Sequence, residues 1–285
     1  MTKSPEANIP YDAWLSFAFT KQCDFQCQYC ASNIIRKILK KVSIAHSIKI
    51  EKLIDTLGRT KKIFKISFTG GGEPFFIPNI LETCAQLTTK HYIDFVTNLI
   101  SPKIKLLVQS INPKKVLLIT ASLHIKELER HKLLDVFIAH YHLCKENGFP
   151  VIAQEVAYPP LVTEIAYWKK YFKTHNVNFL FVPFSGIHKG KHYPAAYTDK
   201  EINQFELDPG VRNSFRHFGK MCNAGHNFGV VSPKGTITTC VDVRTSVGNI
   251  YKTIRFRDTL LSCPSQTCTC PAFLYDNALL KKSLS

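Results

Sequence analysis

The sequence predicts an α/β fold, a partial (β/α)6 TIM-like barrel followed by a small cysteine-rich α+β extension. Apolar runs of strand length alternate with amphipathic helical patterns, the alternation repeats six times, and the pattern changes after residue 190. Strand–helix alternation favours a parallel sheet with right-handed crossovers. Six units are fewer than the eight of a closed barrel, so we expect a partial barrel or an open, curved sheet.

The expected strands are rich in Val, Ile and Phe and are bounded by Gly, Pro or Asn. They lie at 14–20, 63–69, 92–97, 116–122, 151–157 and 177–184. The helical patterns lie near 28–41, 47–58, 79–89, 102–110, 126–146 and 163–174. Because active sites of such folds lie at the C-terminal ends of the strands, we expect the chemistry to be there.

The change of pattern predicts two units, a barrel at 13–190 and an extension at 191–285. In the extension, short helices are expected at 199–207 and 252–262. Strands are expected at 228–231 and 236–240, joined by a Ser-Pro-Lys-Gly turn.

Composition restricts the location and the partners. With 285 residues, 45% of them hydrophobic, the chain can bury a large core. There is no apolar run of about 18 residues and no signal-peptide pattern, so we expect a cytoplasmic protein without a membrane span. Thiols stay reduced there. The net charge of +16 can attract RNA or acidic partners, but the lysines are spread along the chain, which favours a solvated surface.

Eight of the ten cysteines fall into two groups, which favours metal ligation over disulfides. Cys84 and Cys144 stand apart and are expected to be core thiols. Cys23, Cys27 and Cys30 have the spacing C-x3-C-x2-C. Three thiolates can hold three irons of a [4Fe–4S] cluster and leave the fourth iron open, whereas electron carriers use four cysteines. A zinc site with a histidine ligand is the alternative.

This cysteine spacing, with Tyr29 before the third cysteine, and the G-G-E-P sequence at 71–74 after the second strand resemble the radical SAM superfamily. The resemblance implies that Cys23, Cys27 and Cys30 ligate a [4Fe–4S] cluster whose open iron binds S-adenosylmethionine (AdoMet). One electron from the cluster then cleaves AdoMet, and the resulting 5′-deoxyadenosyl radical abstracts hydrogen from a C–H bond of the substrate.

The resemblance also suggests a cofactor-binding set at the strand ends. Glycines can let the backbone approach the methionine amino group, and a neighbouring acid can position that region. A strand-end hydroxyl can bind the ribose or carboxylate, and an apolar residue can pack on the adenine. In this order the expected residues are Gly71, Gly72, Glu73, Ser122 and Val182, with Asn98 and Glu155 as weaker candidates and Tyr29 beside the cluster.

The second cysteine group is similar to the twitch or SPASM extension of radical SAM enzymes. Cys222 and Cys240 enclose an expected hairpin in the pattern C-x12-G-x4-C. Cys263, Cys268 and Cys270 follow as C-x4-C-x-C. Five cysteines are too few for two clusters, so the resemblance implies one auxiliary [4Fe–4S] cluster held by the first pair and two of the last three. A structural zinc site is the alternative.

The favoured function is maturation of a ribosomally made peptide. Oxidation or rearrangement of a small molecule (a sugar, aminocyclitol or nucleoside) is the main alternative, and RNA modification ranks below it. From another class, the chain could be a non-enzymatic Fe–S or zinc interaction protein. A reductant such as flavodoxin or ferredoxin is expected. Because the first strand begins near residue 14, we also expect any leader-binding protein to be separate.

Overall fold

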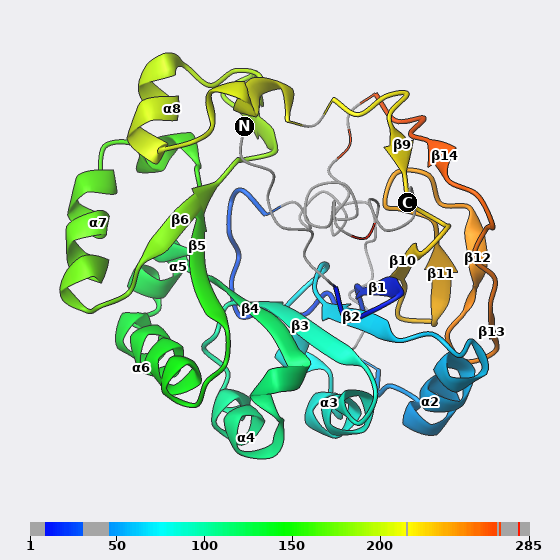
Figure 1. Ribbon diagram of the computed structural model, residues 1–285. Helices are drawn as coiled ribbons and strands as arrows, with labels where there is room; N and C mark the ends of the chain where they lie inside the picture. The colour runs from blue at the N-terminus through cyan, green and yellow to red at the C-terminus, as the bar shows by residue number, and fades with distance from the viewer. Residues whose placement is uncertain (1–8, 31–45, 215, 267, 269–278, 280–285) are drawn as a thin grey trace.

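The structure, a computed structural model, describes residues 9–30, 46–214, 216–266, 268 and 279. A ten-stranded sheet in the order β13-β12-β11-β10-β1-β2-β3-β4-β5-β6 dominates it. Figure 1 shows this sheet curving around the centre of the molecule, with α2, α3, α4, α6 and α7 on its outer side. Two further sheets each hold two short strands, β7 with β8 and β9 with β14.

The element bounds are as follows. The helices are α2 (Ile50–Arg59), α3 (Ile80–Thr88), α4 (Lys103–Ser110), α5 (Ile125–Arg130), α6 (Leu134–Glu146), α7 (Ile165–Thr174) and α8 (Asp199–Phe205). The strands of the first half are β1 (Ala13–Phe17), β2 (Phe64–Phe68), β3 (Tyr92–Thr97), β4 (Val116–Ser122), β5 (Val151–Val156) and β6 (Phe179–Val182). The later strands are β7 (Gly186–His188), β8 (Lys191–Tyr193), β9 (Met221–Cys222), β10 (Phe228–Val231), β11 (Thr236–Thr238), β12 (Ser246–Asn249), β13 (Thr253–Ile254) and β14 (Leu261–Ser262).

The predicted partial barrel is confirmed. Each of the strands β1 to β6 pairs in parallel with the next one along the chain. β6 lies at one end of the sheet order and does not pair with β1, so the barrel is open. Every residue of β1 and of β2 is buried, as expected for parallel strands that are covered on both faces. The C-terminal ends of the six strands therefore lie along one rim.

Helix α2 illustrates how the outer layer is attached. It turns Leu53, Thr56 and Leu57 into the core, and its other residues are exposed or partly exposed. This spacing of three and four residues produces the apolar stripe that an outer helix needs. Cys84 of α3 and Cys144 of α6 are fully buried, so both are core thiols, as predicted.

Two helix predictions are wrong. The pattern at 126–146 forms two helices, because Lys132 adopts a left-handed conformation and the Leu133 amide donates to Leu128 O, which ends α5. The segment 252–262 contains β13 and β14 instead of a helix. Here the Arg255 amide donates to Val247 O, so pairing with β12 overrides the helical pattern. The pattern at 28–41 lies mostly outside the described residues.

The chain after residue 190 extends the sheet. β10 pairs in parallel with β1, and β11, β12 and β13 follow as antiparallel neighbours. Helix α8 forms as predicted, and Thr198 and Glu201 build a capping box at its start. No helix in the described part of the chain has the length and apolar character needed to cross a bilayer. The division at residue 190 and the cytoplasmic location remain predictions.

Candidate functional site

The cysteine loop, residues 20–30, follows β1 at the C-terminal rim of the sheet. Cys27 is buried, whereas Cys23 and Cys30 are partly exposed. Burial raises the pKa of Cys27 above its ordinary range, and the nearby charges of Glu127, Cys30 and Cys23 raise it further. The three thiols therefore lie close enough to influence one another, as a shared ligand site requires.

Gly71 and Gly72 bring the end of β2 against the backbone of this loop. Thr20 and Gly71 form an isolated parallel bridge, and the Glu73 amide donates to Gln22 O at 2.7 Å. A Cβ atom on Gly71 would stand 2.4 Å from Thr20 O, and one on Gly72 would stand 2.1 Å from Gln22 O. Glycine is needed here because two backbones touch, whereas the expected contact with a cofactor remains a prediction.

Glu73 joins the ends of β2 and β3. Its buried carboxylate accepts hydrogen bonds from Thr97 Oγ1 at 2.7 Å, from the Asn98 amide at 2.8 Å and from the Phe75 amide at 3.3 Å. Burial raises the pKa of Glu73 to about 7, although these three donors act in the opposite direction. Asn98 Nδ2 in turn donates to Asp24 Oδ2 at 3.2 Å, inside the cysteine loop. Glu73 and Asn98 thus position the loop.

Glu127 at the start of α5 is a residue that the sequence analysis missed. Its Oε2 atom accepts a hydrogen bond from the Gln26 amide at 3.0 Å, next to Cys27. Arg130 Nη2 pairs with the same oxygen at 2.5 Å. Nothing in the local pattern marks Glu127, because it resembles any acidic residue in the first turn of a helix.

Tyr29 lies between the second and third cysteines and contacts two strand ends. Its hydroxyl donates to Glu155 Oε1 at 2.9 Å and lies 3.1 Å from His124 Nδ1. Glu155 Oε2 accepts from the Ile125 amide at 2.7 Å, which connects β5 to α5. Burial raises the pKa of Glu155 to about 7 and lowers the pKa of His124 to about 4. Like Glu127, His124 is a residue that the sequence analysis did not single out for a role.

Two other sequence candidates stand at strand ends but have no hydrogen bond to the loop among the described residues. Ser122 is the last residue of β4 and lies beside Gln154 of β5. Val182 is the last residue of β6 and is partly buried. Their positions on the rim agree with the prediction, and their contacts with AdoMet remain a prediction.

A second group of cysteines lines a cavity of about 300 Å³. The four thiols are Cys222, Cys240, Cys263 and Cys268. Burial raises the pKa of Cys222 to about 11, and the other three cysteines contribute to the shift, so the four sulfur atoms are neighbours. Cys263 and Cys268 thus lie beside the first pair, and their role as ligands remains a prediction. Cys270 lies outside the described residues.

Backbone amides point at two of these sulfur atoms. The Ala224 amide donates to Cys222 Sγ at 3.5 Å, and the Val243 amide donates to Cys240 Sγ at 3.0 Å. Such donors stabilise thiolates, the form in which cysteine binds metals. Within the described ranges, no three His, Cys, Asp or Glu side chains are placed to hold a metal ion.

No protein-family profile matches this sequence, and no curated protein sequence matches it. Solved structures do match its fold. Native anSMEcpe with bound AdoMet has a TM-score of 0.61 at 16% identity, over 85% of this chain and 78% of that one. The same protein with AdoMet and the Kp18Cys peptide has a TM-score of 0.59 at 16% identity, over 85% and 79%.

Streptococcus suis SuiB bound to its precursor peptide SuiA also matches. Its TM-score is 0.54 at 16% identity, over 87% of this chain and 65% of that one. These neighbours are radical SAM enzymes. This chain therefore shares its fold, an open parallel sheet with a cysteine loop after β1, with these enzymes.

Proposed function

We propose that this chain is a radical SAM enzyme that binds a [4Fe–4S] cluster and AdoMet at the cysteine loop. The observation that carries the proposal is the way the loop is held. Four residues close to the cysteines each bond to a different element. The Gln22 carbonyl accepts from the Glu73 amide after β2, and Asp24 accepts from Asn98 after β3. The Gln26 amide donates to Glu127 in α5, and the Tyr29 hydroxyl donates to Glu155 on β5. These four anchors fix the loop on the rim of the sheet.

The donor set fits the cofactor. Three thiols lie near one another on the rim, and two of them are partly exposed, so a second molecule can reach the site. When bound, the cluster supplies one electron to AdoMet and so produces the radical that attacks a substrate C–H bond. The chain itself orients the thiols: Glu155 fixes the ring of Tyr29, and Glu127 fixes the backbone beside Cys27.

The four-cysteine cavity supports an auxiliary [4Fe–4S] cluster in a twitch-like or SPASM-like extension, residues 191–285. Four cysteines close such a cluster and leave no iron open. Cys222, Cys240, Cys263 and Cys268 supply four thiols that line one cavity of about 300 Å³. A closed cluster can pass electrons, and a flavodoxin or ferredoxin is the proposed reductant.

The substrate we favour is a peptide. Two of the structures described above contain peptides, namely the Kp18Cys peptide with anSMEcpe and the precursor SuiA with SuiB. These neighbours share the fold at 16% identity, so they support the substrate class and no particular sequence.

The first test is cleavage of AdoMet by the anaerobically reconstituted and reduced protein, measured as 5′-deoxyadenosine. The variant Cys30→Ala should abolish the product, because its thiol belongs to the proposed ligand set. Cys84→Ala is the matched control, since that thiol is buried in the core away from both cysteine groups. Absence of product from a fully loaded wild-type protein would reject the enzyme assignment. A product that survives in Cys30→Ala would reject the site.

A further inference from the structure

A large cleft lies at the opposite end of the strands from the cysteine loop. Its volume is about 770 Å³. Asp12 stands just before β1 and Lys62 just before β2, so the cleft opens at the N-terminal ends of these strands. The cysteine loop follows the C-terminal end of β1. None of the proposed ligands of either cluster lines this cleft.

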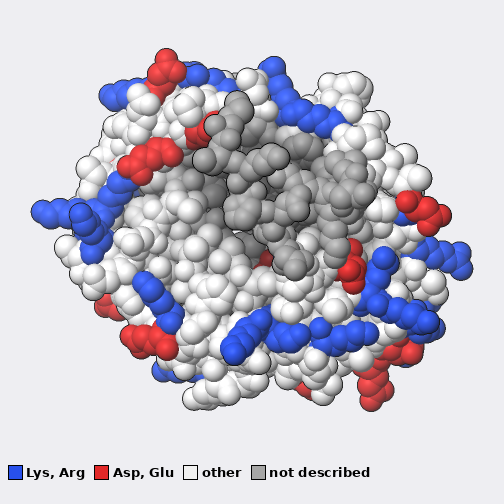
Figure 2. Space-filling view, viewed as in Figure 1, with Lys and Arg blue, Asp and Glu red and all other residues white. Residues whose placement is uncertain are grey.

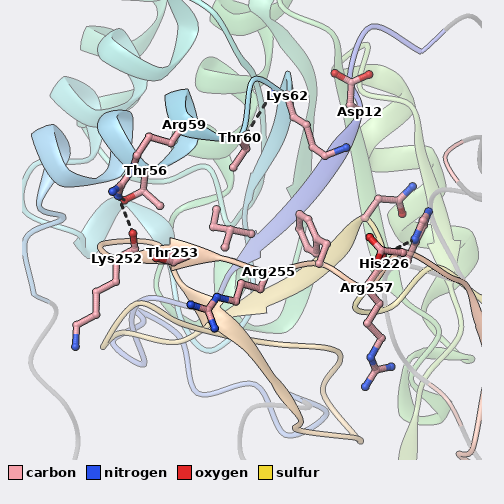
Figure 3. A pocket seen from close by; sticks show the side chains of 14 residues that line it. Asp12, Thr56, Arg59, Thr60, Lys62, His226, Lys252, Thr253, Arg255 and Arg257 are labelled. Carbon is pink, nitrogen blue, oxygen red and sulfur yellow. Dashed lines mark hydrogen bonds between the residues drawn. The ribbon is translucent and has the colours of Figure 1, made fainter.

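The cleft is strongly basic. Five of its lining residues are Lys or Arg, and they come from two separate walls: Arg59, Lys62, Lys252, Arg255 and Arg257. Figure 3 shows the first two near the end of α2 and the other three on the segment that contains β13. In Figure 2, Lys and Arg side chains gather at the lower right of this face, where Figure 1 places α2 and β13.

At least three of these five cations form no ion pair with the residues that the structure describes. Arg59 pairs with Asp55 and donates to Lys252 O at 2.7 Å, which ties the two walls together. No acidic side chain of the described residues forms an ion pair with Lys62, Lys252 or Arg255. Two acidic residues, Asp12 and Asp258, also line the cleft, so basic side chains outnumber acidic ones by five to two. This excess of positive charge favours an anionic ligand.

The backbone on one wall indicates the shape of that ligand. β13 is the last strand of the ten-stranded sheet, so one side of its backbone pairs with no other described strand. Both of its residues, Thr253 and Ile254, line the cleft. An extended peptide can add to such an edge through main-chain hydrogen bonds, while flanking side chains select its sequence. Lys252 and Arg255 flank the edge on either side.

We propose that this basic cleft binds an extended, carboxylate-rich peptide segment along β13. RNA fits less well, because single-stranded sites combine cations with exposed aromatic rings for stacking. Phe256 supplies the one benzene ring among the lining residues, and it is partly buried. The peptide would be recruited here whether or not the chain cleaves AdoMet, since the cleft and the cysteine loop lie at opposite ends of β1.

The test uses the full-length protein and a fluorescent eight-residue peptide of alternating Glu and Ser. Fluorescence anisotropy at low salt should show binding, and a Lys–Ser peptide of the same length should not bind. The double variant K252E/R255E should weaken the acidic peptide about tenfold or more. Hydrogen exchange should show new protection of residues 253–256 when the peptide is bound.

The matched control is K170E/K173E, which changes the net charge equally on exposed positions of α7. In Figure 1, α7 lies on the other side of the molecule from α2 and β13. Thermal unfolding of both variants verifies that each is folded. Equal losses in the two variants, or unchanged binding in K252E/R255E, would overturn the proposal. Displacement of the peptide by equimolar inorganic phosphate, or equal binding of oligouridylate, would also overturn it.

Discussion

The two cysteine regions hold their thiols in different ways. In the loop after β1, the side chains and amides between the cysteines are tied to residues that are distant in sequence, such as Glu127 and Glu155. In the C-terminal cavity, local backbone amides at Ala224 and Val243 point directly at the sulfur atoms. The first region is positioned by the barrel, whereas the second is positioned by its own short hairpins and turns.

The difference indicates how strongly substitutions and changes of pH should disturb each region. The first contains buried carboxylates, and both Glu73 and Glu155 have a pKa raised to about 7 by burial. The carboxylate that lines the second region, Asp242, is exposed. Substitutions far from the cysteines, and changes of pH, should therefore disturb the first region more than the second.

The largest expected effect separates the two cysteine sets. The pair Cys27→Ala and Cys30→Ala should lower AdoMet cleavage by more than about 100-fold, since even changes outside the ligand set commonly cost about 10–100-fold. The pair Cys222→Ala and Cys263→Ala should instead leave cleavage measurable and remove one cluster. Iron analysis should find about eight atoms per chain in the wild type and about four in each pair. Loss of all iron from either pair would contradict two independent sites.

The next effect concerns the contact between the glycine segment and the cysteine loop. Gly72→Ala should destabilise the protein by about 2–3 kcal/mol, because its Cβ would stand 2.1 Å from Gln22 O. Gly58→Ala in α2 is the control: nothing lies within 4 Å of its Cβ, so it should stabilise the protein by about 0.5–1 kcal/mol. Urea unfolding measures both. A neutral Gly72→Ala would show that the two backbones are not tightly apposed.

A smaller effect is the pH dependence of stability in the cluster-free protein. The pKa of Glu73 is about 7 in the folded state and 4.5 as its ordinary value, so the folded state holds more protons between these values. Its contribution to stability is present below about pH 4.5 and is lost as pH rises toward 7. Glu73→Gln should reduce this slope by about 1 kcal/mol per pH unit, and Asp242→Asn should leave it unchanged. Equal slopes in wild type and Glu73→Gln would be the contrary result.

The smallest expected effect tests whether the first region extends along the rim to Ser122. If its hydroxyl contacts AdoMet, Ser122→Ala should raise the KM for AdoMet about threefold to tenfold, the equivalent of one hydrogen bond. The exposed Ser110 at the end of α4 offers the control Ser110→Ala. Initial rates of 5′-deoxyadenosine formation across AdoMet concentrations give both values. An unchanged KM would remove Ser122 from the cofactor site.

The sequence predicted the six barrel strands because apolar runs bounded by Gly, Pro and Asn are read locally. It also placed Glu73, Asn98 and Glu155 at strand ends, where the structure finds them. It did not reveal what these residues do. Glu73 contacts Thr97, and Glu155 contacts Tyr29, only because parallel pairing brings distant strand ends to one rim.

The wrong and missing predictions have the same cause, namely contacts between residues that are distant in sequence. The segment 252–262 has a helical pattern, but pairing of β13 with β12 decides its conformation. Glu127 and His124 carry no signal in sequence, since their importance depends on Gln26 and Tyr29 arriving from about a hundred residues away. Likewise, the basic cleft joins α2 to the β13 segment, which no local pattern connects.

The parallel pairing of β1 with β10 has a consequence for synthesis. β1 is the strand that leads into the cysteine loop, yet one of its neighbours comes from residues 228–231. Until the ribosome has released that stretch, the backbone edge of β1 that pairs with β10 stays open to other chains. A nascent or truncated chain ending near residue 190 is therefore expected to aggregate. Metal delivered at that stage would reach a sheet in which β1 has not yet paired with β10.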